Sequence, residues 1–359
     1  MLFKTILGLA AIVAAKPIAT NGNETSLETR GIIRVTTKEL NSIKFFSQHA
    51  AAAYCNSDTA TGQPLRCNNA ACPLVMLNKP VVVASMALSG KFTGVGAYVA
   101  IDFRRKEIVF AVRGSNNIRN YITDMIFAWS DCDLTPQCKL HAGFAAAWNE
   151  IRGTALNAIK SAHRQYPNYK IVSTGHSLGA AIATIGAAYL RRDGLAVDLY
   201  TFGSPRIGNN KFANWFISRP GGHWRVTHES DIIPRLPPIF MGYRHVSPEY
   251  WLSGGSSEQT DYSVSQVSVC SGIANTQCNG SRFTPDMFAH LYYLGDTAAC
   301  AAFPLHLRDG NSEEGSLPQD LMDRLASWSQ QDHQLAGTFY YLDDSEYVDG
   351  NEFVETNEI

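Results

Sequence analysis

Hydrophobic and polar positions follow two patterns along the middle of the chain, one typical of strands and one typical of helices. Runs rich in apolar and β-branched residues predict strands at Val81–Ala87, Gly96–Asp102, Glu107–Arg113, Tyr169–Thr174, Val197–Phe202 and Trp224–His228. Apolar positions at helical spacing predict helices at residues 38–54, Phe144–Gln165 and Leu178–Arg192. Strands that alternate with helices in this way predict an α/β fold with a central, mostly parallel sheet.

The two ends of the chain have patterns unlike the middle. Residues 1–15 combine one lysine with a short apolar run and small residues, as a secretory signal peptide does. Residues 16–30 are polar and lack periodicity, which predicts a pro-segment. Residues 305–359 differ in composition from the rest and form a C-terminal extension that processing could remove. The sequence therefore predicts one large domain at residues 31–304.

Charge is distributed unevenly between these parts. The 359 residues include 30 basic and 32 acidic side chains, a formal net charge of −2, which excludes a strongly basic nucleic-acid-binding protein. With 45% hydrophobic and 17% charged residues, the chain has enough apolar material for a large core and is not a disordered protein. Residues 305–359 contain 13 acidic and two basic side chains, so the extension carries −11 and the rest of the chain +9.

Eight cysteines, an even number, are typical of a protein from an oxidising compartment. Three pairs lie close in sequence and suggest local loops: Cys67 and Cys72, Cys132 and Cys138, and Cys270 and Cys278. Cys55 and Cys300 are left over, and a bond between them would tie together the two ends of the body. The absence of a CxxC pair from the sequence disfavours a zinc site. Sequons at Asn23 and Asn279 permit glycosylation.

One short segment carries chemistry in its residue types and spacing. Gly175-His176-Ser177-Leu178-Gly179 has the G-x-S-x-G spacing of a nucleophile elbow and lies between a predicted strand and a predicted helix. A turn this sharp leaves no room for side chains at its flanking positions, which are therefore glycine. The turn would present Ser177 above the sheet, with free N–H groups of the helix beneath it. The segment predicts a serine nucleophile and makes the Leu178 N–H a natural donor to an oxyanion.

A serine nucleophile needs a histidine base and an acid that orients the base. With this motif the chain order is serine, acid, histidine. Asp231 follows the predicted strand Trp224–His228 and precedes a proline-rich loop that could hold it in place. Beyond it, the histidines of the acidic extension lie outside the body, which leaves His245 and His290. Spacing alone does not choose between these two.

Further motifs spread in order along the chain give these residues a family context. They are Ala51–Cys55, Val112–Ser115, Gly175–Gly179, Gly203–Asn209, Asp231–Pro238, Ser247–Trp251 and Ala289–Tyr293. In this combination, over about residues 36–304, the chain resembles the secreted filamentous-fungal triacylglycerol lipases of the Rhizomucor–Thermomyces type, the class 3 lipase family. Among these it is most similar to the lipases of Fusarium-like moulds.

The resemblance implies an α/β-hydrolase-type fold with a nucleophile elbow and a helical lid. It implies Ser177 as nucleophile, Asp231 as acid and His290 as base, and so selects between the two histidines. It also implies that Ser115 and Leu178 form the oxyanion hole. The resemblance supports three of the cysteine pairs, and the remaining pair is then expected as an additional bridge: Cys55–Cys300, Cys67–Cys72 and Cys132–Cys138, with Cys270–Cys278 as the addition.

Residues 116–127 follow Ser115 and have the pattern of an amphipathic helix. Apolar side chains recur at i, i+3, i+4, i+7 and i+8, namely Ile118, Tyr121, Ile122, Met125 and Ile126. When closed, such a lid can bury its apolar stripe over the active site. Opening exposes the stripe to water unless a lipid surface receives it, so we expect the open form to be favoured at an interface.

Together these features predict a secreted, extracellular serine esterase, a triacylglycerol lipase that hydrolyses carboxylic ester bonds at lipid–water interfaces. The chemistry requires no metal and no cofactor. The expected partners are a lipid ester substrate and, reversibly, a lipid interface, without nucleic acid or a transmembrane segment. Feruloyl esterases and phospholipases of the same fold are alternatives, and a non-catalytic protein that binds lipid surfaces is a remote one.

The acidic extension suggests a regulatory hypothesis. Its apolar residues Leu317, Leu321, Leu325 and Trp328 share one helical face. An acidic segment with an apolar face could dock on the basic, lid-bearing face of the body and restrain activity. The alternative is a solvated appendage.

Overall fold

The computed structural model describes residues 35–68, 70–87, 93–115, 122, 126–301 and 317–339. The predicted signal peptide and pro-segment, and Asn23 with them, lie outside these residues. None of the helices in the described ranges is long and apolar enough to cross a membrane.

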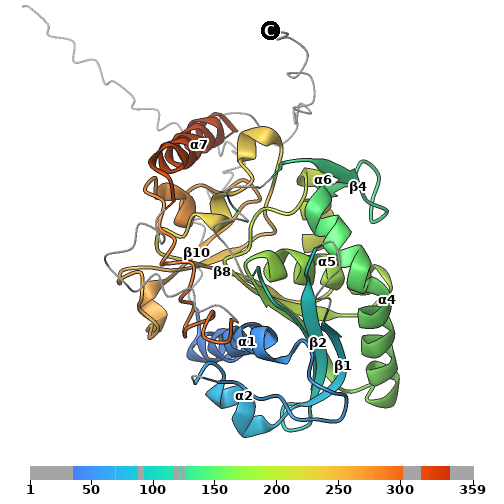
Figure 1. Cartoon of the computed structure of the whole chain (residues 1–359). Coiled ribbons are helices and arrows are strands. Elements are labelled where there is room, and N and C mark those ends of the chain that lie inside the picture. The colour runs from blue at the N-terminus through green and yellow to red at the C-terminus, as the bar shows by residue number, and fades with distance from the viewer. Residues whose placement is uncertain are drawn as a thin grey trace, which may run out of the picture. The chain divides into compact units, whose positions relative to one another are not determined.

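An eight-stranded sheet forms the centre of the described chain (Figure 1). In spatial order its strands are β1 (Val81–Ala87), β2 (Gly96–Asp102), β3 (Glu107–Val112), β6 (Lys170–His176), β7 (Val197–Phe202), β8 (His223–His228), β9 (Glu249–Leu252) and β10 (Val267–Cys270). The strands from β3 to β9 run parallel, whereas β1 and β2 at one edge and β10 at the other are antiparallel to their neighbours. The predicted central, mostly parallel sheet is confirmed.

Helices cover both faces of this sheet and bury a separate core on each. α1 (Thr37–Asn56) packs on one face, and α4 (Ala142–Gln165) with α5 (Leu178–Arg192) packs on the other. Because successive side chains of a strand point to opposite faces, Tyr98 of β2 lies in the α1 core and Val99 in the α4–α5 core. The fully buried strands β2 and β3 follow from this two-sided covering.

The six strands and three helices that the alternating pattern predicts for the middle of the chain are present within two residues of their expected bounds. Several short elements were not predicted, because a few residues are too short to show a period. They are α2 (Pro73–Asn78), β4 (Trp129–Asp131), β5 (Lys139–His141), α6 (Asn210–Ile217), β9, β10, and the 3-10 turns η1 (Ile233–Arg235), η2 (Ile239–Met241), η3 (Val264–Gln266) and η4 (Asn279–Ser281).

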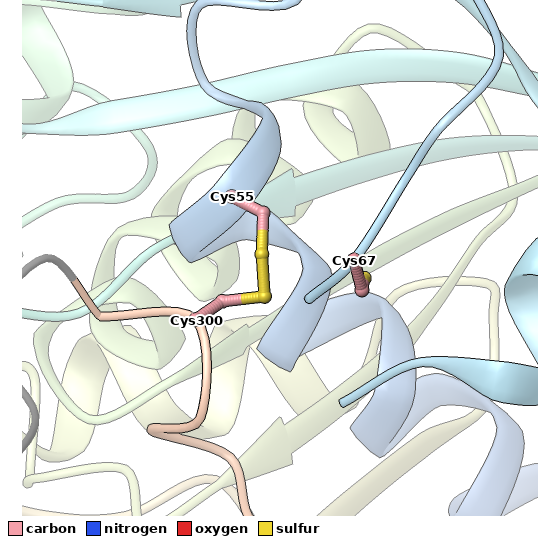
Figure 2. Close-up of side chains that lie close together, drawn as sticks. All are labelled: Cys55, Cys67 and Cys300. Carbon is pink, nitrogen blue, oxygen red and sulfur yellow. A yellow bond between two sulfur atoms is a disulfide. The ribbon is translucent and has the colours of Figure 1, made fainter. Parts of the chain in front are cut away.

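Four disulfide bonds link the described cysteines: Cys55–Cys300, Cys67–Cys72, Cys132–Cys138 and Cys270–Cys278. The first joins the end of α1 to a segment 245 positions away. The sulfur of Cys67 lies beside this bridge, within 4.8 Å of both of its sulfur atoms (Figure 2). Since all three sulfurs are in disulfides, this cluster offers no thiolate to a metal ion.

The C-terminal extension contributes one helix to the described structure, α7 (Gln319–Phe339), drawn in red in Figure 1. Leu317, Leu321 and Leu325 are buried on one side and Trp328 is partly buried beside them, which confirms the predicted apolar face. These side chains join one hydrophobic cluster with residues of the body: Ile122, Ile232, Ile233, Leu236 and Met287. The helical part of the extension is therefore packed on the body and is not a solvated appendage.

Candidate active site

Ser177 lies at the junction of β6 and α5. Its backbone has φ +57° and ψ −130°, a conformation that residues with a side chain rarely adopt, and its N–H donates to the Phe202 carbonyl at 2.9 Å. The serine is the N-cap of α5, and its side chain makes no capping hydrogen bond to the first N–H groups of that helix. The local fold thus places a hydroxyl at the positive end of a helix dipole.

The two glycines of the motif allow the chain to pass close to itself at this turn. A Cβ atom on Gly175 would lie 2.4 Å from the Gly179 carbonyl oxygen. A Cβ atom on Gly179 would lie 2.2 Å from the carbonyl oxygen of Val112 in the neighbouring strand β3. Both distances are far below van der Waals contact, so any larger residue would push α5 away from the sheet.

Asp231 and His290 form a buried pair close to this turn. Nδ1 of His290 lies 2.8 Å from Oδ2 of Asp231, and both side chains are 0% exposed. The Tyr293 hydroxyl donates to the same Oδ2, and the Ile233 N–H donates to Oδ1 at 2.9 Å. Asp231 therefore holds the imidazole while its own two oxygens are fixed by the fold.

The hydrogen bonds of Asp231 decide its charge. Burial alone would raise the pKa of this carboxyl, but the attraction of His290 and the bonds from His290, Tyr293 and Ile233 outweigh burial and lower the pKa below its usual value. Burial and the charge of Asp231 raise the pKa of Tyr293 well above its usual value, so its hydroxyl stays protonated and donates. The acid of the pair is thus ionised, and its two oxygens accept the bonds that hold it.

The second histidine that spacing left open lies elsewhere. His245 is buried, and its Nε2 lies 2.6 Å from the carbonyl oxygen of Pro234 in the loop that follows Asp231. The structure therefore brings His290, and not His245, to the carboxylate. The spacing of residues along the sequence does not distinguish the two histidines, because the path of the chain after β8 decides which of them reaches Asp231.

The remaining candidate residues converge on Ser177 because β3 and β6 are parallel neighbours whose carboxyl ends share one edge of the sheet. Ser115 follows β3, and Leu178 is the first residue of α5. A Cβ atom on Gly114 would lie 3.0 Å from the Ser177 Cβ, so the segment carrying Ser115 passes directly beside the serine. The segment that carries Ser115 and the first residue of α5 therefore both lie next to Ser177 along the backbone.

The site is closed in this structure. Ser177 is 1% exposed and His290 is 0% exposed. Oγ of Ser177 and Nε2 of His290 are both buried, and neither has a hydrogen-bond partner within the described ranges. Buried polar atoms without a protein partner are typical of groups that receive a ligand.

The predicted lid lies mostly outside the described residues. Ile118, Tyr121 and Met125 are among the positions not described. Ile122 is 5% exposed and packs in the cluster that contains the apolar face of α7. Ile126 is 77% exposed, so it does not share the buried side of Ile122 as the five-residue stripe predicts. Ile126 itself is not helical.

A buried ion pair fastens α7 to the body beside the cluster. Nη1 of Arg206 lies 2.8 Å from Oδ2 of Asp332, with side-chain exposures of 3% and 4%. The other oxygen of Asp332 accepts from the N–H groups of Ile239 at 2.7 Å and Phe240 at 3.2 Å. Asp332 thus accepts hydrogen bonds from the first N–H groups of η2. It is a functional candidate that sequence patterns did not reveal.

The sequon asparagine of the body is also part of this region. Asn279 is 1% exposed, and its Nδ2 donates to the carbonyl oxygens of Glu229 at 3.0 Å and Asp231 at 2.9 Å. The amide is therefore engaged on the backbone that carries Asp231. In this fold it is inaccessible to a glycan, against the permissive reading of its sequon.

Five buried histidines and the half-buried His223 have pKa values below the usual range because burial disfavours their charged form: His49 at about 3, His141 at about 4, His176 at about 3, and His228, His245 and His223. Their ring nitrogens hydrogen-bond mainly to backbone carbonyls and tyrosine hydroxyls. They are held neutral inside the fold.

We expect these histidines to make the protein less stable in acid. In the unfolded chain these histidines are protonated below about pH 6.5, whereas in the folded chain they are protonated only below about pH 3 to 4. The free energy of unfolding therefore falls as the pH falls through this window. The slope approaches about 1.4 kcal/mol per pH unit for each such histidine. Urea unfolding at about pH 7 and pH 5 measures it, and equal midpoints would contradict the prediction. A His49→Asn variant should show a shallower slope.

Comparison with known proteins places this geometry in a family. The profile of the family described as "Lipase (class 3)" matches residues 109–241. The chain is 45% identical to the "Secreted mono- and diacylglycerol lipase 1" of Fusarium solani, over 93% of this chain and 98% of that protein. It is 32% identical to the "Lipase" of Rhizomucor miehei, over 75% of this chain and 73% of that protein.

Solved structures of relatives share the fold. The mono- and diacylglycerol lipase from Aspergillus oryzae superposes with a TM-score of 0.69 at 35% identity, covering 74% of this chain and 99% of that chain. A structure described as a triacylglycerol lipase with a serine protease triad as its catalytic centre superposes with a TM-score of 0.65 at 30% identity, covering 75% of this chain and 100% of that chain.

Proposed function

The chain belongs to the fungal class 3 lipases, and we propose that Ser177, His290 and Asp231 perform its ester hydrolysis as nucleophile, base and orienting acid. The observation that carries the proposal is the buried His290–Asp231 pair of 2.8 Å at the edge of the sheet where the strained Ser177 turn lies. The names of the relatives support an extracellular enzyme, and this lipase is secreted.

The reaction begins when Oγ of Ser177 attacks the ester carbonyl carbon and Nε2 of His290 takes the hydroxyl proton. Asp231 keeps the proton on Nδ1 of His290 and stabilises the imidazolium that forms. His290 then protonates the departing alcohol oxygen, and the acyl group stays on Ser177. Water, activated by the same imidazole, releases the fatty acid and restores the serine.

The oxyanion of each tetrahedral intermediate needs donors that are fixed before it forms. We propose the N–H groups of Leu178 and Ser115, with help from the Ser115 hydroxyl. The first belongs to the free N-terminus of α5, and the second follows Gly114, which passes against Ser177. In the closed enzyme the distances for proton transfer are not yet formed, which is common before substrate binds.

The substrate class follows from the family and from the apolar surroundings of the site. We propose long-chain acylglycerols, with triacylglycerol as the principal substrate. The name of the Fusarium solani relative makes mono- and diacylglycerols the second candidate. Ile232, Ile233 and Met287 lie close to Asp231 and His290 in the chain and belong to one apolar cluster, which suits acyl chains better than sugar esters.

Initial rates on matched substrates test this proposal. We expect emulsified trioleoylglycerol, dioleoylglycerol and mono-oleoylglycerol to be cleaved, and palmitoyl esters to be cleaved faster than butyryl esters of the same alcohol. Methyl ferulate and phosphatidylcholine serve as the comparison substrates. A preference for ferulate or for phospholipid by kcat/KM would overturn the acylglycerol assignment, and cleavage confined to mono- and dioleoylglycerol would overturn the triacylglycerol part of it.

We further propose that α7 restrains the opening of the site. Its leucines share a cluster with Ile122 of the lid segment and with Ile232 and Ile233, which follow Asp231 directly. Any movement of Ile122 out of this cluster must break this packing. Asp332 strengthens the contact, because removing α7 would leave Arg206 buried without its carboxylate.

Undocking α7 is expected to accelerate interfacial hydrolysis. A Leu321→Asp/Leu325→Asp variant places two charges in the buried cluster, whereas Gln330→Asp adds a charge on the exposed side of the same helix. Losing about 1.4 kcal/mol of closed-state stabilisation raises the open population about tenfold. We expect that gain on emulsified triacylglycerol for the double variant and none for the control. Unchanged rates in both would leave α7 a structural appendage.

A further inference from the structure

The base His290 lies on an irregular segment and not on a helix or strand. Between β10 and α7 the described chain has only the short turn η4, and His290 follows that turn without regular secondary structure. The bonds that the backbone N–H groups next to the base donate are local, such as the His290 N–H to the Met287 carbonyl at 3.2 Å and the Leu291 N–H to the Phe288 carbonyl at 2.9 Å. Catalytic groups carried by loops need support from rigid elements, because a small displacement of the base costs much of the rate.

Two buried histidines from the central sheet supply such support. Nε2 of His176, the last residue of β6, lies 2.8 Å from the carbonyl oxygen of His290. Nδ1 of His228, the last residue of β8, lies 2.8 Å from the carbonyl oxygen of Ala289. These are the carbonyls of the two peptide groups on either side of the His290 Cα. Together the two contacts fix the planes from which the base side chain projects.

The partners of each ring determine where its proton lies. A carbonyl oxygen only accepts, so His176 carries hydrogen on Nε2 and accepts at Nδ1 from the Tyr54 hydroxyl at 2.9 Å. By the same argument His228 carries hydrogen on Nδ1 and accepts at Nε2 from the Tyr262 hydroxyl at 2.6 Å. The two rings use opposite nitrogens for the same task. Each is locked in one tautomer by a tyrosine.

Neither ring brings a charge to the site. His176 is 2% exposed and His228 is 0% exposed, and burial lowers the pKa of both. The His176 ring lies 4.5 Å from the His290 ring, so a cation there would disfavour the imidazolium that forms on His290 in the reaction. Two neutral donors can hold the base without opposing its protonation.

We propose that His176 and His228 are positioning residues that hold the base His290 through the backbone carbonyls on either side of it. The proposal rests on the role of His290 proposed above. It does not require either ring to touch the substrate. It predicts that turnover requires one N–H donor at each position, at the place of Nε2 in His176 and at the place of Nδ1 in His228.

Amide side chains test this because they offer a neutral donor at one ring position or the other. The amide nitrogen of asparagine lies near the place of a histidine Nδ1, and that of glutamine near the place of Nε2. We expect His228→Asn to keep kcat on a soluble butyryl ester within about threefold of the wild type, and His228→Gln to lose about tenfold or more. At position 176 the order reverses, with Gln active and Asn impaired.

Melting temperatures, and variants of Tyr54 and Tyr262, distinguish a positioning role of the two histidines from a purely stabilising one. Within each pair of variants we expect a difference in kcat with similar melting temperatures, and Tyr262→Phe and Tyr54→Phe should lower kcat less than the impaired variants do. Equal kcat within each pair, or losses that follow the melting temperature alone, would overturn the proposal. His290→Ala is measured alongside: if it retained turnover, the proposed base would fail, whereas an inactive His290→Ala with equal pairs refutes only the positioning role.

Discussion

Replacing Ser177 with alanine is expected to abolish hydrolysis while leaving the protein folded. The Oγ atom has no hydrogen-bond partner among the described residues, so its removal costs the fold little. Loss of the nucleophile should lower kcat by about three to six orders of magnitude on emulsified and soluble esters alike. Initial rates on both substrates, with urea unfolding of the same samples, measure the effect.

Ser173, on the strand β6 that leads to Ser177, provides the matched control. Ser173 is also buried, but its Oγ donates to the Ala183 carbonyl at 2.8 Å, away from the reacting atoms. Ser173→Ala should therefore lower the free energy of unfolding by about 1 kcal/mol and keep turnover. Turnover retained by Ser177→Ala, or lost equally in both variants, would contradict the assignment of the nucleophile.

Replacing Asp231 with asparagine should produce the next largest effect. An amide in this place offers an N–H where the carboxylate accepts from Nδ1 of His290, and it favours the wrong tautomer of the ring. A loss of about 10⁴ in kcat is expected from the equivalent change in a Ser-His-Asp triad, with little change in KM. Single-turnover kinetics on a soluble ester separates the chemical step from binding.

Asp198 is the matched control for this change, because it lies near the start of β7 and binds the Gly222 N–H at 2.8 Å. Asp198→Asn should keep kcat within a few fold, since its carboxylate touches no proposed reacting group. If Asp231→Asn lowered kcat no more than Asp198→Asn does, Asp231 would not be the orienting acid.

Much of the fold could be predicted from the sequence, because its main elements are long enough to show a period. The strand and helix on either side of Ser177 follow from the apolar run before it and the alanine-rich stretch after it. The glycines of the elbow are explained by close approaches that the motif itself anticipates. The last two strands of the sheet, β9 and β10, have only four residues each and were too short for this reasoning.

The site was predictable only where local pattern decides it. Spacing could not choose between His245 and His290, because that choice depends on how the chain returns past β9 and β10 to the sheet edge. The Tyr293 hydroxyl on Asp231 was likewise hidden, since a tyrosine three residues after a histidine has many structural uses. The Arg206–Asp332 ion pair joins positions 126 residues apart, and no sequence pattern connects them.

Covalent labelling of the folded, full-length enzyme by a long-chain alkyl phosphonate tests whether Ser177 is the nucleophile and His290 its base. The reagent is given in detergent micelles, so that the closed site can open, and the modified peptide is identified by mass spectrometry. We expect one phosphonate per chain, bound to Ser177. Labelling should be lost in Ser177→Ala and strongly slowed in His290→Ala. Labelling of a different residue, or full hydrolytic activity without any label on Ser177, would contradict this assignment.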